Sequence, residues 1–116
     1  MAYKIRAALL ICLFALAGRA SFASAVSFIP RYAHTSTLLP DRTIVVAGGV
    51  LDGGGYTDGV QISLEAKDDF ANALPLSVAR AGHTATLLPN GKILVAGGVN
   101  AVGVQQTTEI YNPLTG

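Results

Sequence analysis

The sequence predicts an all-β fold built from two tandem copies of one structural unit. Arg31–Val50 aligns with Arg80–Val99, and 13 of the 20 aligned positions are identical, which indicates a duplication. Within each copy, short β-forming runs alternate with Gly, Pro, Asn and Asp, a pattern that favours strands joined by turns. About half of the 116 residues are apolar and only 13% are charged, so a disordered polar chain is excluded.

The second copy shows the expected elements most clearly. His83–Leu88 is rich in threonine and alternates in part, which predicts a strand. Pro89–Lys92 contains Asn-Gly and predicts a turn, because both residues tolerate a positive φ angle. Ile93–Ala96 is continuously apolar, which predicts a strand covered on both faces. Gly97-Gly98 ends that strand, and Glu109–Tyr111 predicts a third one.

The first copy repeats this order with differences. Its turn, Pro40–Thr43, lacks the glycine, so we expect either a different turn type or mild strain. After an adjustment of one residue, Gln61–Ser63 aligns with Glu109–Tyr111. A fourth strand is expected around Asp69–Leu74. Beyond the first 25 residues, no stretch combines helical periodicity with capping residues.

Four strands in about 50 residues, apolar on both faces and repeated in tandem, are typical of propeller blades, which stack against a neighbour on each side. We therefore expect residues 26–116 to form about two blades of an incomplete ring, with repeat 1 at about 31–79 and repeat 2 at about 80–116. Because the second repeat stops after three strands, we expect either a piece of a longer protein or a subunit that completes its ring by self-association.

Three features resemble kelch repeats, of the kind found in galactose-oxidase-like propellers and exported bacterial kelch proteins. They are the repeated Arg-x-x-His-Thr-x-Thr-Leu-Leu-Pro segment, the Gly-Gly pair after an apolar strand, and Glu109–Gly116. The resemblance covers Arg31–Gly116 and implies a β-propeller scaffold. Phe70 and Leu76 depart from the family pattern, because they stand where the family usually has a Trp and a Met.

The same resemblance raises the question of an oxidase activity. Galactose-oxidase-like enzymes carry a copper centre with a cysteine cross-linked to a tyrosine, whereas Cys12 in the leader is the only cysteine here. The tyrosines form no recognisable ligand set with the two histidines. No catalytic position transfers, so the sequence predicts a chain that is not an enzyme and needs no metal or cofactor.

The first 25 residues predict a secretory signal peptide with a helical apolar run. Lys4 and Arg6 precede the uncharged stretch Ala7–Gly18, and small residues then predict cleavage after Ala25, with cleavage after Ala20 as the alternative. The apolar run is shorter than the roughly 20 residues that span a membrane, so we expect no stable membrane span after cleavage. The predicted location is secreted, periplasmic or at the cell surface; a buried N-terminal helix is the other interpretation.

The charge distribution argues against a nucleic-acid partner. The formal net charge of +1 includes three basic residues of the leader, and the remaining chain carries 5 basic and 7 acidic groups. No basic footprint for nucleic acid is present.

Residues that the duplication pairs are expected to be structural. The histidines are expected to bond backbone between adjacent strands, since a metal pair needs closer spacing or further ligands. The arginines are expected to be structural or rim charges. The structural motif comprises Arg31, His34, Gly48, Gly49, Arg80, His83, Gly97, Gly98 and Tyr111.

The glycine-rich loop Asp52–Gly59 is the candidate ligand site. Asp52, Tyr56 and Asp58 lie in it, and two carboxylates in a glycine-rich loop suit Ca²⁺ as one interpretation. The spacing does not match the known calcium-loop pattern, and a solvated connection between strands is the simpler interpretation.

The sequence favours an exported, non-catalytic propeller segment that binds a protein or a carbohydrate. The alternative is a piece of a larger secreted kelch or galactose-oxidase-like enzyme whose catalytic residues lie outside this chain. A third hypothesis is a purely structural surface protein.

Overall fold

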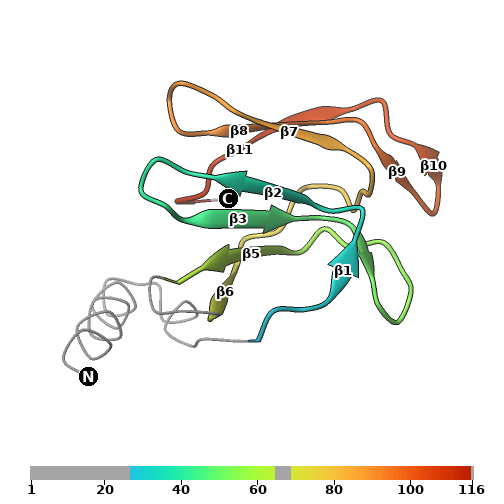
Figure 1. The fold of residues 1–116 in the computed structure, drawn as a ribbon. Coiled ribbons are helices and arrows are strands. Elements are labelled where there is room, and N and C mark those ends of the chain that lie inside the picture. The colour runs from blue at the N-terminus through green and yellow to red at the C-terminus, as the bar shows by residue number, and fades with distance from the viewer. Residues whose placement is uncertain (1–26, 65–68, 116) are drawn as a thin grey trace.

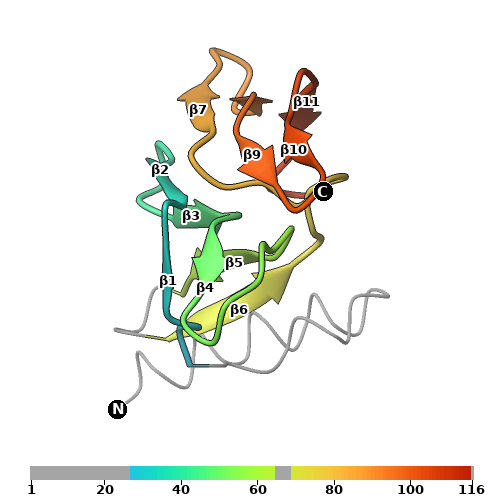
Figure 2. The same cartoon turned by 90° about the vertical axis from the view of Figure 1, so that its right-hand side faces the viewer.

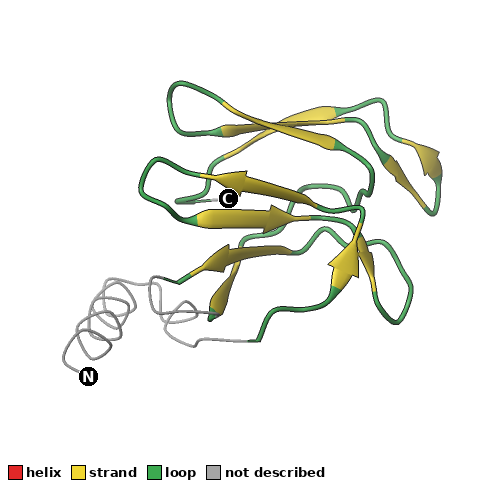
Figure 3. Cartoon of the chain, viewed as in Figure 1, coloured by secondary structure: helices red, strands yellow, loops and turns green. Residues whose placement is uncertain are grey.

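A computed structural model describes residues 27–64 and 69–115, which form an all-β structure of small antiparallel sheets. Figure 3 shows strands and loops, with no helix among the described residues. None of the described residues belongs to a helix long and apolar enough to cross a membrane. The predicted signal peptide and its cleavage site lie outside the described residues.

The first sheet has four strands in the order β2-β3-β5-β6. Their bounds are Thr35–Leu38, Ile44–Ala47, Val60–Ser63 and Phe70–Ala73. Strand β6 confirms the fourth strand expected around Asp69–Leu74.

The second sheet has three strands in the order β11-β8-β7. Strand β7 spans Thr84–Leu87, β8 spans Ile93–Ala96 and β11 spans Thr108–Tyr111, which confirms the three strands expected in this copy. In Figure 1 this sheet lies against the first one, with β7 beside β2.

Two short ribbons accompany these sheets. Strand β1 (Arg31–Tyr32) pairs with β4 (Val50–Leu51), and β9 (Val99–Asn100) pairs with β10 (Gly103–Val104). An isolated bridge between Ala81 and Val99 repeats, 49 residues later, the pairing of Tyr32 with Val50.

Both sheets use the same register, so the duplication extends to strand pairing. Val46 lies opposite Ser36 on one side and Gln61 on the other. Val95 lies opposite Ala85 and Glu109 in the same way. The alignment of Gln61 with Glu109 is therefore confirmed.

The core lies between the two sheets. Alternate residues of a strand point to opposite faces, so one face of the first sheet meets one face of the second. The connection between the sheets adds Leu76. The buried cluster consists of Val45, Ala47, Val60, Leu76, Ile93, Val95 and Tyr111.

The two central strands differ in how far they are covered. In β3, Val45, Val46 and Ala47 are all buried. In β8, only Ile93 and Val95 are buried, while Leu94 and Ala96 are partly exposed. The expectation that Ile93–Ala96 is covered on both faces is wrong, because among the described residues nothing covers the outer face of the second sheet.

The two hairpin turns have the same hydrogen bonds. Leu39 N donates to Thr43 O and Arg42 N to Leu39 O, and the equivalent atoms bond in the second copy. Arg42 therefore adopts a φ of 72°, where Gly91 has 82°. The expected strain is confirmed, and the expectation of a different turn type is wrong.

Candidate functional site

The paired motif residues form the framework that holds the loops. Arg80 is fully buried, and its Nη1 donates to Gly97 O and Thr107 O, both at 2.9 Å. Its Nη2 donates to Thr107 Oγ1 and forms an ion pair with Glu109 at 3.5 Å. A buried guanidinium requires such partners. Because this side chain is fully buried, the rim-charge interpretation is wrong for Arg80.

Arg31 makes the equivalent contacts in the first copy. Its Nη1 donates to Gly48 O at 3.1 Å and to Gly59 O at 2.9 Å, and its Nη2 approaches Gln61 Oε1 at 3.4 Å. A neutral amide thus replaces the carboxylate of Glu109. Each arginine ties the Gly-Gly turn of its own repeat to the start of the third strand.

His83 joins the two repeats. Its Nε2 lies 2.9 Å from Thr35 Oγ1 in the first sheet. This hydrogen bond joins the two sheets through a side-chain hydroxyl. Burial lowers the pKa of His83, and the nearby Arg80 guanidinium adds to this effect.

His34, the equivalent of His83, lies in an edge-to-face contact with Phe28. Its Nδ1 is buried without a hydrogen-bond partner, as is Nδ1 of His83. In the part of the chain that the structure describes, no three His, Cys, Asp or Glu side chains gather as metal ligands.

The Gly-Gly pairs allow backbone segments to approach closely. A Cβ on Gly48 would lie 2.5 Å from Arg80 O, and one on Gly49 would lie 2.7 Å from Tyr32 O. Gly98 repeats the second contact with Ala81 O at 2.7 Å. A Cβ on Gly97 would meet nothing closer than Gln105 O at 3.9 Å. All four glycines have positive φ angles.

Tyr111 belongs to the buried core between the two sheets. Its ring is buried and its hydroxyl donates to Leu74 O at 2.7 Å. Burial, together with the nearby charge of Glu109, raises its pKa to about 12. Tyr111 therefore has a structural role as a neutral phenol.

The loop edge comprises residues 51–59 and 99–107, which follow the Gly-Gly pairs of the two repeats. Figure 2 shows β4, β9 and β10 on the side of the molecule that this edge occupies. In the first loop, backbone bonds from Leu51 N to Gly55 O and from Thr57 N to Gly49 O fix the chain. The side chains of Asp52, Tyr56 and Asp58 are exposed. The structure thus places the candidate ligand residues on one loop, without a metal-ligand cluster among the described residues.

The second loop presents apolar side chains. Val102 is 93% exposed at the tip of the β9-β10 hairpin, and Val99 and Val104 are exposed beside it. Sequence reasoning missed these residues. The signal was present as three valines around Gly103 in a loop that lacks charged residues.

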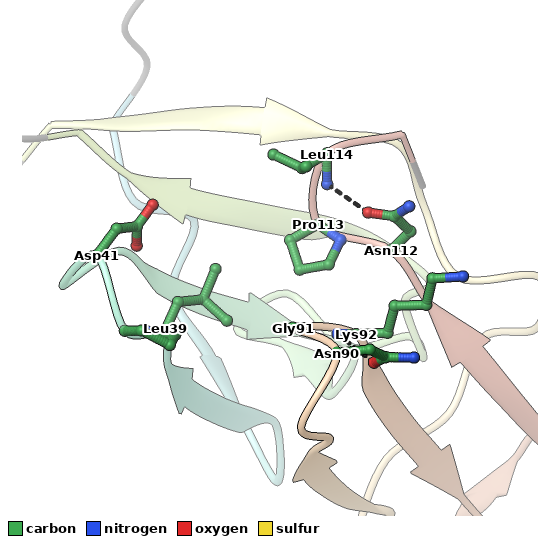
Figure 4. Close-up of a pocket in the computed structure, with 9 residues that line it drawn as sticks. Leu39, Asp41, Asn90, Gly91, Lys92, Asn112, Pro113 and Leu114 are labelled. Atoms are coloured by element: carbon green, nitrogen blue, oxygen red, sulfur yellow. Dashed lines mark hydrogen bonds between the residues drawn. The ribbon is translucent and has the colours of Figure 1, made fainter.

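A shallow pocket lies at the opposite end, between the two hairpin turns (Figure 4). Its volume is about 290 Å³. Asp41 and Asn90 occupy equivalent positions, and each side chain accepts a hydrogen bond from the backbone two residues later. Sequence reasoning did not anticipate the pocket, which is lined by Leu39, Pro40, Asp41, Asn90, Gly91, Lys92, Asn112, Pro113 and Leu114.

No protein-family model and no curated protein matches this chain.

Proposed function

We propose that this chain is an exported, non-catalytic interaction module made of kelch-type propeller blades, and that its ligand binds at the loop edge. The shared register of the two sheets and the repeated Arg, His and Gly-Gly contacts support the blade interpretation. A blade places its loops at defined ends of a rigid sheet, which suits binding.

The observation that carries the proposal is the contrast between framework and loops. Arg31 and Arg80 hold their repeats with matching bonds, whereas the two loops that they support differ in chemistry. Loop 51–59 exposes Asp52, Tyr56 and Asp58, and loop 99–107 exposes valines. A constant framework with differing loops is typical of binding surfaces.

The loop chemistry favours a protein ligand over a carbohydrate. Burying the exposed apolar side chains of a hairpin tip against an apolar partner lowers the free energy of the complex. Tyr56, 40% exposed, adds an aromatic side chain of the kind enriched in protein interfaces. Asp52 and Asp58 would select a basic partner surface.

The experiment compares ligand binding by the purified chain and two variants. One variant carries Asp52→Asn, Tyr56→Ala and Asp58→Asn; the control carries Asp41→Asn at the opposite end. The labelled proteins are applied to an array of basic peptides and to a glycan array. We expect specific peptide binding that the triple variant loses and the control retains. Binding to neither array, or equal binding by all three proteins, would contradict the proposal.

A further inference from the structure

The outer face of the second sheet, together with its Gly-Gly pair, forms a surface with a specific shape. This tail surface comprises Gly97 and Gly98 and the outward residues of β7, β8 and β11, which are Thr84, Thr86, Leu94, Ala96, Thr108 and Ile110. In Figure 1 this face is turned away from the first sheet. The duplication shows what such a surface binds, because the first repeat contains its equivalent.

In the first repeat, the equivalent surface is occupied by the start of the second repeat. Gly49 N donates to Arg80 O at 2.8 Å, and Gly82 N donates to Ala33 O at 2.8 Å. His83 Nε2 and Thr35 Oγ1 form the third bond at 2.9 Å. The missing Cβ of Gly48 leaves room for Arg80 O.

The tail surface offers the same groups without these partners. Among the described residues, Gly98 N donates to no acceptor and Gly82 O accepts from no donor. The Thr84 side chain, equivalent to Thr35, is exposed. The space next to Gly97 is open, whereas Arg80 O fills the equivalent space next to Gly48.

The apolar residues of the tail surface are more exposed than their equivalents in the first repeat. Val45 is buried in the first sheet, whereas its equivalent Leu94 is partly exposed. Ile110 on the tail surface is 52% exposed, while its equivalent Ile62 packs against the core. Apart from Thr108, which stands where the first repeat has the buried Val60, the tail surface thus has the residue types of an internal contact and the exposure of an external one.

The first repeat presents the complementary surface beside the middle of the sheet, where Val46 is already buried and Phe28 contacts His34. This head surface comprises the segment Arg31–His34, equivalent to the docked segment Arg80–His83, and the apolar side chains of Leu38 and Ile44. Ile44 is 39% exposed, whereas its equivalent Ile93 is 2% exposed in the core. Leu38 is 63% exposed, whereas its equivalent Leu87 packs against the core.

We propose that a second copy of this chain binds the tail surface with its head surface. In this contact Gly98 N donates to Arg31 O of the second copy, and Ala33 N of the second copy donates to Gly82 O. His34 of the second copy bonds Thr84 Oγ1, as His83 bonds Thr35. The two surfaces differ, so the contact is head-to-tail, and such a contact generates rings or filaments of several copies.

Sedimentation velocity over a wide concentration range tests the proposal with the purified full chain. We expect concentration-dependent association that Gly97→Ala weakens at least about tenfold, because its Cβ would enter the space for the incoming carbonyl. Gly91→Ala is the matched control. Gly91 has a similar positive φ and no atom near its Cβ, but lies in the turn at the other end of the sheet. This control carries the same backbone strain and is expected to associate like the wild type.

A mixing experiment tests the head-to-tail geometry. Leu38→Glu places a charge on the exposed head surface and should also abolish self-association, whereas Val102→Glu on the hairpin tip should not. Leu38→Glu retains a tail and Gly97→Ala retains a head, so an equimolar mixture should form a dimer of the two variants. A wild-type chain that stays monomeric at every concentration would overturn the proposal. So would association that survives both substitutions, or a mixture that remains monomeric.

Discussion

At the scale of single residues, the two repeats differ mainly in what surrounds identical side chains. Arg80 and Arg31 make matching bonds, but Arg80 is fully buried and pairs with Glu109, whereas Arg31 is partly exposed and faces Gln61. Removing one partner of a buried charge leaves the other without compensation, which costs more than losing an exposed pair. The carboxylate therefore stands in the repeat where the arginine is buried.

The bond between Thr35 and His83 should contribute measurably to the contact between repeats. We expect Thr35→Val to lower the free energy of unfolding by about 1 kcal/mol, because it removes one intramolecular hydrogen bond. Thr84→Val is the matched control, since its hydroxyl is exposed. Denaturant unfolding of dilute protein measures both variants, and equal losses would contradict this assignment.

His83 should make stability depend on pH below neutrality. Burial and the Arg80 guanidinium lower its pKa in the folded state, so the unfolded chain binds a proton below about pH 6.5 while the folded chain does not. The stabilising contribution is thus present above that pH and is lost as the pH falls towards the folded pKa. Between pH 8 and pH 5, the melting temperature of His83→Gln should fall less steeply than that of the wild type. An unchanged slope would show that His83 is not the titrating group.

Tyr111 should produce the opposite dependence at high pH. Its folded pKa of about 12 exceeds the ordinary value of about 10, so stability falls as the pH rises from about 10 towards 12. Tyr111→Phe should remove this decline and cost about 1 kcal/mol at neutral pH, because the bond to Leu74 O is lost. Unfolding curves at neutral and alkaline pH measure both effects. Tyr56→Phe, with an exposed ring, is the control, and a decline that persists in Tyr111→Phe would contradict the assignment.

At the scale of elements, the hairpin turns show how one geometry accepts two sequences. Leu39 N and Leu88 N each donate to a carbonyl four residues later, so the strands are held identically in both repeats. Gly91 adopts the required positive φ without strain, whereas Arg42 adopts it with a Cβ in place. The turn geometry is therefore set by the paired strands on either side rather than by the turn residues.

Arg42→Gly should stabilise the first hairpin. Removing the Cβ relieves the steric strain of the left-handed conformation, which is worth about 1–2 kcal/mol of folding free energy. The greater flexibility of glycine in the unfolded chain offsets part of this gain. We expect a net gain of about 0.5–1 kcal/mol in denaturant unfolding. Loss of stability on this substitution would mean that the Arg42 side chain makes a contact that outweighs its strain.

At the scale of the whole molecule, the sequence predicts elements well and contacts between repeats poorly. The strands around Ile93 and Phe70 follow from local residue patterns, and the shared register follows from the duplication. The pairing of His83 with Thr35 is not predictable, because it joins residues 48 positions apart in different sheets. The exposure of Leu94 is not predictable either, since an apolar run has the same sequence whether one face of the strand or both are covered.

The residues of the candidate site were likewise only partly predictable from the sequence. The position of loop 51–59 is evident from its glycines, and Asp52 and Tyr56 are exposed as a ligand site requires. The valines of the second loop were missed because apolar residues are usually assigned to the core. Only the arrangement of the two sheets shows that both loops lie at one edge of the molecule.

Amide hydrogen exchange at Gly49 and Gly98 tests whether the two Gly-Gly pairs are equivalent, with the first occupied by the following repeat and the second open to another copy. In dilute protein, Gly49 N should be protected by its bond to Arg80 O, and Gly98 N should exchange rapidly. At concentrations where the chain associates, Gly98 should become protected as well. Rapid exchange of Gly49 in dilute protein, or equal protection of both amides there, would contradict this difference between the two Gly-Gly pairs.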